Sequence, residues 1–180
     1  ADEMKYLIMC EGPNELEIIR MLLENNKLIF TENDLLNLVP YHARQIGKSA
    51  AVKTALSLYQ GEVKILRIGD KLGEKLTIPK QYKWQIKEVE KYCTKPELEM
   101  LLIISDNKEA AFEKVKTSMS PKIFSKENIS YHRIRYNNST AFYREYYEDR
   151  IDLLVDAIKR YKQLKRKHKK DEWYLADLLK

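Results

Sequence analysis

Two acidic side chains come directly after predicted strands, at positions where an acid can take part in chemistry. Glu11 follows the apolar run KYLIMC at 5–10, and Asp70 follows the apolar residues at 63–68. Parallel strands end at one edge of their sheet, and ligands of α/β proteins bind beyond that edge. Two carboxylates that meet there repel each other unless one keeps its proton or a cation joins them. Magnesium suits such a pair because it prefers oxygen ligands, although acids at strand ends also serve as helix caps.

The elements that must position these acids follow from hydrophobic periodicity. Apolar residues recur at helical spacing after Asn14 and again over 49–59, so one helix follows the first strand and another precedes the second. This order predicts an α/β fold with a mainly parallel sheet of about four strands and helices on both faces. Residues 71–92, with many lysines, Gly73 and Pro79, predict a connection on the surface.

The second half of the chain predicts mostly helices. Residues 96–116 predict one helix that begins at Pro96, and the alternative is a strand over 100–105 that ends before Asp106. The remaining predictions are a short helix at 31–38, a last strand at 132–136, a helix at 143–169 and a short final helix. We therefore expect an α/β domain at 1–142 and a C-terminal helical extension at 143–180 that packs on the same domain.

Composition excludes several classes of protein. With 44% hydrophobic and 33% charged residues in 180, the chain is typical of a globular protein and not of a disordered one. No apolar run approaches the roughly 20 residues of a membrane span, and no signal-peptide pattern is present, so we expect a cytoplasmic protein without a membrane partner. Cys10 and Cys93 lack metal-ligand spacing, and Cys10 is predicted to be a buried thiol.

The positive charge is concentrated in one segment. Of the 33 Lys and Arg residues, eight fall between Lys159 and Lys170, and without them the chain is slightly acidic. The segment is predicted to contact the phosphates of nucleic acid through Lys165, Arg166 and Lys167. The alternative is a solvated helix end, where cations are stabilised by the helix dipole.

Three short motifs together resemble one family. The sequence EGPNE at 11–15 resembles the first motif of the Toprim fold and is similar to the EGxxTE form of RloB-like Toprim proteins. The strand ILRIGD, followed by Lys71 and Leu72, resembles the Asp-x-Asp motif of that fold. The sequence PELEMLL at 96–102 resembles its Pro-x-Phe-Glu-x-x-Leu segment, and the three motifs occur in the expected order.

The resemblance implies a magnesium-dependent nuclease or phosphodiesterase of a mobile-element or phage-defence system, with nucleic acid as its partner. In that family pattern Glu11 is the general acid/base or a metal-side carboxylate, and Glu15 is its neighbour. Asp70 is the metal ligand, and Glu99 is a further acid. Lys48, Arg67 and Lys71 would hold the phosphate backbone.

Leu72 departs from this pattern. It stands where the second Asp of Asp-x-Asp is expected, which predicts weak magnesium binding. A rival alignment uses Asp106 as the metal ligand, with Lys108 in place of the second Asp.

Two other functions remain open. The first is a catalytically degenerate Toprim-like module that binds nucleic acid or protein; the Tyr- and Arg-rich residues 131–147 could stack on bases, or they could pack in the protein interior. The second is an acyl-CoA-dependent N-acyltransferase, because RQIGKS at 44–49 precedes a helix and resembles a pyrophosphate-binding loop.

Overall fold

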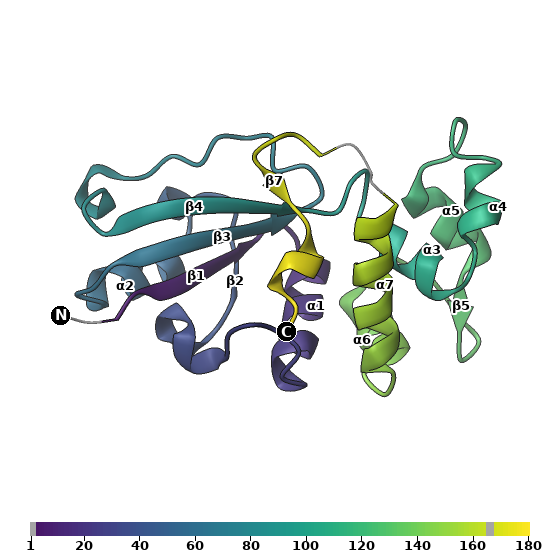
Figure 1. Ribbon diagram of the computed structural model, residues 1–180, viewed down its shortest axis with the longest axis horizontal. Coiled ribbons are helices and arrows are strands. Elements are labelled where there is room, and N and C mark those ends of the chain that lie inside the picture. Colours follow the sequence, from purple (N-terminus) through teal and green to yellow (C-terminus); the bar gives the residue numbers. More distant parts are fainter. Residues whose placement is uncertain (1–2, 165–167) are drawn as a thin grey trace.

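A parallel sheet of five strands organises the chain in the computed structural model, which describes residues 3–164 and 168–180 (Figure 1). The strand order is β2-β1-β3-β4-β7, and every neighbouring pair is parallel. The strands are β1 (Lys5–Cys10), β2 (Tyr41–His42), β3 (Val63–Gly69), β4 (Ile86–Cys93) and β7 (Glu172–Trp173). A separate antiparallel hairpin is formed by β5 (Ser130–Tyr131) and β6 (Ile134–Arg135).

Seven α-helices are found in the described residues: α1 (Pro13–Glu24), α2 (Ala50–Leu58), α3 (Met100–Ser105), α4 (Glu109–Glu113), α5 (Pro121–Asn128), α6 (Thr140–Tyr147) and α7 (Ile151–Gln163). Short 3-10 turns η1 to η5 cover Glu32–Asp34, Leu36–Leu38, Ile46–Lys48, Lys80–Tyr82 and Leu175–Leu178.

Helices cover both faces of the sheet, as the sequence predicts. Side chains alternate along a strand, so Ile8 and Cys10 of β1 enter one core with α1 and the helical half of the chain. Leu7 and Met9 enter a second core on the opposite face, which contains the inner side of α2. The α/β prediction is therefore confirmed, with one strand more than expected.

The register of the two central strands brings their ends level. Cys10 pairs with Ile68, and the Glu11 N–H donates to the Ile68 carbonyl oxygen at 2.8 Å. The strands point toward the helical part of the molecule formed by α3 to α7 (Figure 1). The carboxyl edge of the sheet, which carries Glu11 and Asp70, therefore faces this helical part.

Most of strand β4 lies in the segment 71–92, which the sequence predicted as a surface connection, and this prediction is wrong for residues 86–92. The strand was missed because charged residues occupy much of it, including Glu88 and Glu90. Both carboxylates form ion pairs with Lys64 on the neighbouring strand, at 3.3 and 3.1 Å. Cross-strand pairing of opposite charges thus replaces the apolar contacts expected of a strand.

The single helix predicted at 96–116 is two helices, α3 and α4, which are separated at Asn107, a residue with φ of 58°. The alternative strand over 100–105 is wrong, because these residues form α3. The predicted helix over 143–169 is likewise divided into α6 and α7, and the expected domain boundary at 142 falls inside α6.

Two smaller predictions also differ from the structure. The strand expected at 132–136 belongs to the β5–β6 hairpin and does not join the main sheet. The short helix expected at 31–38 is two 3-10 turns, η1 and η2.

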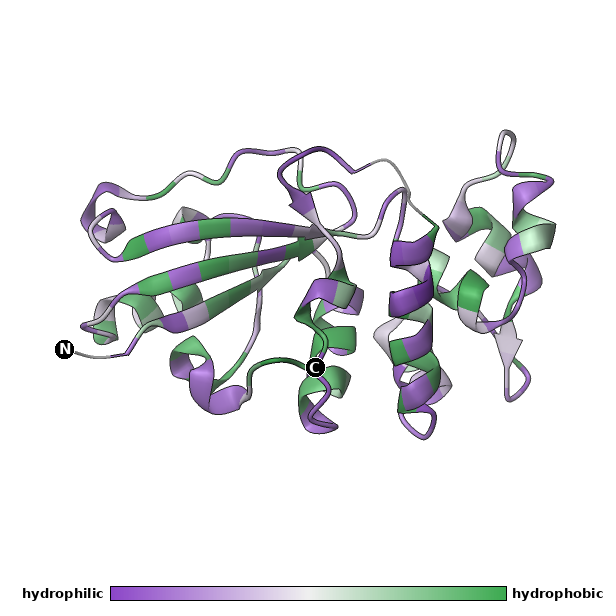
Figure 2. Ribbon diagram, in the orientation of Figure 1, coloured by the Kyte–Doolittle hydropathy of each residue, from purple (hydrophilic) through white to green (hydrophobic). Residues whose placement is uncertain are grey.

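Helix α7 shows how the C-terminal residues pack on the rest of the chain. Hydrophilic and hydrophobic residues alternate along it (Figure 2), and Leu154, Ile158 and Tyr161 are buried in the core that also contains α3. The residues that follow, as β7, add a fifth strand beside β4. None of the described helices has the length and apolar character needed to cross a membrane.

A buried ion pair anchors β7. Glu172 has a side chain only 2% exposed, and it accepts hydrogen bonds from the Lys95 ammonium and the Lys169 N–H, both at 2.6 Å. Burial alone would raise the pKa of Glu172, but these two donors hold it below its usual value. The neighbouring Asp171 pairs with Lys91 at 3.3 Å and is 66% exposed.

We predict that Glu172→Gln lowers the free energy of unfolding by about 1–3 kcal/mol at pH 7, because it leaves a partly buried ammonium without its charged partner. Urea denaturation measures this. The ionised carboxylate stabilises the fold only while it is charged, so the difference between Glu172→Gln and the parent should shrink as the pH falls below the usual glutamate range. Asp171→Asn is the matched control and should have a much smaller effect, because the Asp171 ion pair is exposed to solvent; an equal loss of stability for both changes would contradict the buried-pair interpretation.

Candidate active site

Three of the predicted acids meet in one cavity at the carboxyl edge of the sheet. The cavity has a volume of about 270 Å³, and Glu11, Glu15 and Asp70 lie in its wall. The other lining residues are Gly12, Pro13, Asn14, Arg44, Lys122 and Asn138. Segments from five separate parts of the chain therefore build this carboxylate cavity.

Two glycines allow the acids to approach the sheet and each other. A Cβ atom on Gly69 would lie 2.8 Å from the Cβ of Glu11, and one on Gly12 would lie 2.5 Å from Glu15 Oε2. Such contacts are shorter than atoms tolerate, so a larger residue at either position would displace a carboxylate. Glu15 belongs to the first turn of α1, immediately after this tight connection.

Asp70 is the most strongly perturbed acid of the cavity. Burial raises its pKa to about 8, and the nearby Glu15 and Glu99 carboxylates contribute to the increase. Thr94 follows β4, and its hydroxyl donates a hydrogen bond to Asp70 Oδ1 at 3.1 Å. This hydrogen bond lowers the pKa of Asp70 and so partly offsets the increase. Asp70 therefore gains and loses its proton close to neutral pH.

Glu99 lies behind the cavity and not in its wall. It is 2% exposed, and the Tyr136 hydroxyl donates to its Oε2 atom at 2.6 Å. Burial raises its pKa, and the Tyr136 hydrogen bond opposes that shift. The pKa of Glu15 is also raised, first by burial and further by the charges of Glu11 and Glu99. The four acids are thus electrostatically coupled.

Two cations that sequence analysis missed balance part of this charge. Arg44 follows β2, and its Nε donates to the carbonyl oxygen of Glu11 at 3.3 Å. Lys122, in the first turn of α5, lowers the pKa values of Glu15 and Glu99. A correct prediction of β2 would have placed Arg44 at the sheet edge, but no local signal connects Lys122 with the acids.

A polar network closes the side of the cavity. Asn14 Nδ2 donates to Asn138 Oδ1 at 3.0 Å, and the Tyr136 hydroxyl reaches the same oxygen at 3.2 Å. The Oδ1 atom of Asn14 is buried and accepts no hydrogen bond from the described residues.

The carboxylates of the cavity offer few ligands for a metal ion. No group of three or more His, Cys, Asp or Glu side chains within 3–164 and 168–180 is arranged to hold a metal. Glu11 and Asp70 are a pair of carboxylates, and magnesium typically takes one or two together with water or phosphate oxygens. Leu72 is 2% exposed, lies close to Gly69 and offers no ligand atom.

Asp106 does not join this cavity. It follows α3, its Oδ1 accepts a hydrogen bond from the Tyr146 hydroxyl at 2.9 Å, and its Oδ2 pairs with Lys108 at 2.7 Å. The alignment that used Asp106 as a strand-end metal ligand is wrong, because the segment before it is helical.

The basic residues predicted to hold a phosphate backbone have different surroundings. Arg67 is 3% exposed on β3, and this burial disfavours the predicted contact with a phosphate backbone. Lys48, in η3, and Lys71, after Asp70, are exposed. Lys165, Arg166 and Lys167 lie outside the described residues.

Part of the basic segment is paired with acids. Arg160 forms a two-pronged hydrogen bond with Glu109, at 3.0 and 3.1 Å, and Lys162 pairs with Asp177. These contacts give the described part of the segment a structural role, so its charge alone is weaker support for nucleic-acid binding than the sequence indicated.

The tyrosines of 131–147 pack in the interior. Tyr136, Tyr143, Tyr146 and Tyr147 are all buried, which favours the packing interpretation of this segment over base stacking.

In the loop 44–49, which resembles a pyrophosphate-binding loop, two side chains form hydrogen bonds within the protein. The Gln45 amide bonds to Lys75 and Thr77, and the Ser49 hydroxyl caps α2 by accepting the Val52 N–H.

Comparison with protein families, with curated proteins and with solved structures found no match to this chain.

We predict that Asp70→Asn makes the protein more stable at pH 8 than the parent, with a smaller difference at pH 5. The pKa of this carboxyl is higher in the folded state, about 8, than its ordinary 3.8, so the folded state binds more protons between these values and loses stability as the pH rises. The effect is at most about 1.4 kcal/mol per pH unit, and partial exposure reduces it.

Urea denaturation at several pH values measures the change. Asp156→Asn on the exposed side of α7 is the control and should leave the pH dependence of the parent unaltered. A constant difference between Asp70→Asn and the parent from pH 5 to pH 8 would contradict the raised pKa of Asp70.

Proposed function

We propose that this protein is a Toprim-like phosphodiesterase that cleaves nucleic acid with the help of magnesium. The observation that carries the proposal is the meeting of Glu11, Glu15 and Asp70 with Arg44 and Lys122 in one cavity beyond the carboxyl ends of parallel strands. This is the edge at which open α/β sheets bind ligands. The three acids come from two of the segments that resemble Toprim motifs, and Glu99 comes from the third.

The cavity offers complementary charges to a phosphodiester. The Arg44 guanidinium and the Lys122 ammonium can pair with the phosphate oxygens, because both line the same cavity as the acids. Magnesium held by Glu11 and Asp70 would neutralise further phosphate charge and polarise the phosphorus–oxygen bond.

Two acids have different roles in proton transfer. Glu15, whose pKa is raised by burial and by neighbouring carboxylates, can hold a proton and donate it to the leaving oxygen. Glu11 lines the same cavity and would accept a proton from the attacking water. The water oxygen forms a bond to phosphorus, and the bond from phosphorus to the leaving oxygen breaks. Glu99 acts on Glu15 and Asp70 through its charge, and the hydrogen bond from Tyr136 fixes the orientation of Glu99.

A second candidate is a Toprim-like module that binds nucleic acid or protein without cleaving it. Leu72 favours this candidate, because an apolar side chain occupies the position at which the family pattern expects a second metal-binding acid. The two candidates differ in whether Glu11 and Asp70 are needed for turnover or only contribute charge to the cavity.

We predict that the protein hydrolyses bis(p-nitrophenyl) phosphate and single-stranded oligonucleotides in the presence of magnesium or manganese. Glu11→Gln and Asp70→Asn should each lower the rate by about 100-fold or more, as expected when a group acts directly in proton transfer or metal binding. Release of nitrophenolate measures the first reaction and gel electrophoresis the second.

The matched control is Glu127→Gln on the exposed side of α5, which should retain the parental rate. If the parent shows no metal-dependent hydrolysis, or if Asp70→Asn is as active as the parent, the catalytic proposal fails and the binding module is favoured.

We predict that Leu72→Asp strengthens magnesium binding. The new carboxylate would lie close to Glu11 and Gly69, and the left-handed φ of 49° at this position is better tolerated by Asp than by Leu. At pH 7 the metal-free variant should be less stable than the parent because it buries another negative charge.

Added magnesium should therefore raise the melting temperature of Leu72→Asp more than that of the parent, and calorimetry should give a higher affinity. Leu72→Asn, which has the same shape without the charge, should not gain affinity. If Leu72→Asp and Leu72→Asn respond equally to magnesium, residue 72 does not face the metal.

A further inference from the structure

A second, larger cavity adjoins the carboxylate cavity. It has a volume of about 510 Å³ and is lined by Lys71, Pro96, Glu97, Phe112 and the segment 116–121. Consecutive residues divide between the two cavities: Asp70 lines the first and Lys71 the second, and Lys122 lines the first and Pro121 the second. The two spaces therefore share a wall.

Glu97 forms part of that shared wall. Its Oε1 atom accepts the N–H of Lys122 at 3.0 Å, and its Oε2 atom lies 4.0 Å from the Lys122 ammonium. Its charge also raises the pKa values of Asp70 and Glu99. A ligand in the second cavity consequently lies within electrostatic reach of the acids that are proposed to do the chemistry.

The lining of the second cavity combines two kinds of surface. Lys71 and Lys116 provide positive charge, and Thr117, Ser118 and Ser120 provide hydroxyl groups. Apart from the Glu97 carboxylate, the remaining wall is apolar or aromatic, formed by Pro96, Phe112, Met119 and Pro121. Lys116 pairs with Glu113 at 2.6 Å, whereas Lys71 forms no ion pair with any residue of 3–164 or 168–180.

We propose that this second cavity is a subsite for one unpaired nucleotide next to the phosphate that is cleaved, so that the substrate is single-stranded nucleic acid. The inference rests on the proposed function, since it assigns a substrate class to the same site. Lys71, which follows Asp70 directly, pairs with the phosphate at the junction of the two cavities. The apolar wall receives the base, and the hydroxyls contact the sugar and the polar edge of the base.

The shape of the cavity favours an unpaired base over a duplex. A volume of about 510 Å³ lies within the range of roughly 300–1,000 Å³ that small-molecule sites occupy. A base inside a duplex is covered on both faces and along its pairing edge, so it can enter a concave site only after it leaves the stack. A single strand avoids this cost, and stacking on an apolar surface tolerates any sequence.

The test measures binding without cleavage. A fluorescein-labelled ten-nucleotide DNA strand and the corresponding duplex are titrated with the full chain in EDTA, and fluorescence anisotropy gives the affinities. We expect the single strand to bind at least about tenfold more tightly than the duplex. Thr117→Trp, which fills the cavity from an exposed turn, should weaken single-strand binding by about tenfold, whereas Thr117→Val should change it by less than about twofold.

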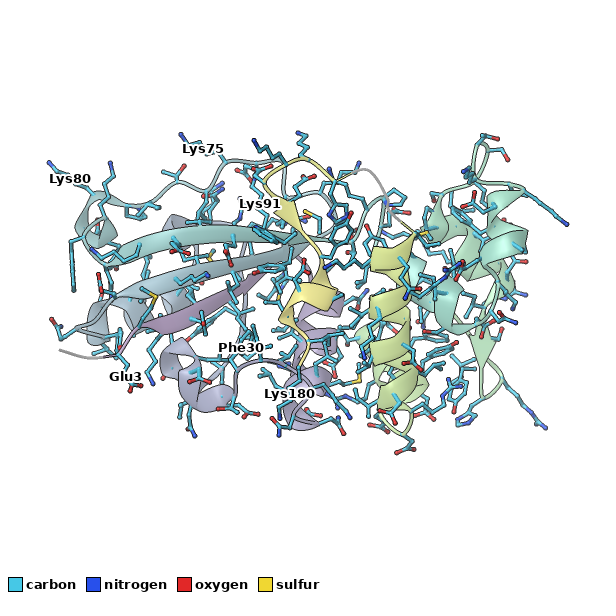
Figure 3. The ribbon with its side chains drawn as sticks, viewed as in Figure 1. Glu3, Phe30, Lys75, Lys80, Lys91 and Lys180 are labelled. Carbon is cyan, nitrogen blue, oxygen red and sulfur yellow. The ribbon has the colours of Figure 1, made fainter. Side chains whose placement is uncertain are left out.

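Two lysine substitutions, one in the second cavity and one distant from it, test the phosphate contact. Lys71→Gln should lower the slope of log K against log salt by about 0.7, the value for one phosphate contact with a single strand. Lys80→Gln removes the same charge at the far end of the sheet, where the Lys80 side chain projects away from the protein (Figure 3), and should leave the slope unchanged. Circular dichroism and melting temperature confirm that each variant is folded.

The outcomes separate this inference from the proposed function. If the small nitrophenyl diester is hydrolysed but Thr117→Trp and Lys71→Gln bind the single strand as the parent does, the subsite is wrong and the phosphodiesterase proposal stands. If both variants weaken binding but no diester is hydrolysed, the subsite stands and the catalytic proposal falls. Equal affinity for single strand and duplex, unaffected by Thr117→Trp, would overturn the assignment of an unpaired base.

Discussion

The mutual repulsion of Glu15, Asp70 and Glu99 in a poorly solvated site is the constraint on which the organisation of this protein depends. Burial raises the pKa of each of these acids. The charge of Glu99 raises the pKa values of Glu15 and Asp70 further, and the charge of Glu15 raises that of Asp70. Such a cluster destabilises the folded state at neutral pH, so the surrounding structure must hold it in place. Cores on both faces of the sheet supply that stability, and the ion pairs of Arg144 with Glu17 and Glu24 join α6 to α1. Ionisable groups whose pKa values are strongly shifted by burial and by nearby like charges are typical of functional sites.

The sheet and the helical part make different contributions to the cluster. The parallel register of β1 and β3 fixes Glu11 and Asp70 at one level, and Gly69 allows the Glu11 side chain to pass the end of β3. The segment before α3 supplies Glu99, which the sheet alone could not orient. Tyr136 then connects Glu99 to Asn138 and so to the wall of the cavity. The backbone fixes the position of the acids, and the helical part sets their charge state by excluding water.

The sequence predicts the parts of the site that depend on local structure. Glu11 and Asp70 follow apolar strands and could be placed at a common edge without the coordinates. Arg44 and Lys122 could not, because their approach depends on a two-residue strand and on the docking of α5. Strand β4 was missed since its exposed face carries charges that pair across the sheet. For Arg67 the necessary signal was present: strand periodicity puts it on the same face as the buried Val63 and Ile65, so its burial follows from the pattern that predicts the strand.

Leu72 shows how the electrostatic constraint extends to a residue that carries no charge. The wall of the cavity already has three acids against two cations, and Glu99 adds a fourth acid behind it. A fifth carboxylate at a position 2% exposed would raise the pKa values of its neighbours further and would need a bound cation to remain ionised. The backbone at this position has a left-handed φ of 49°, which Asp and Asn adopt more readily than Leu. Backbone and side-chain surroundings therefore favour different residues at position 72, and an apolar side chain is the choice that keeps the metal-free cluster stable.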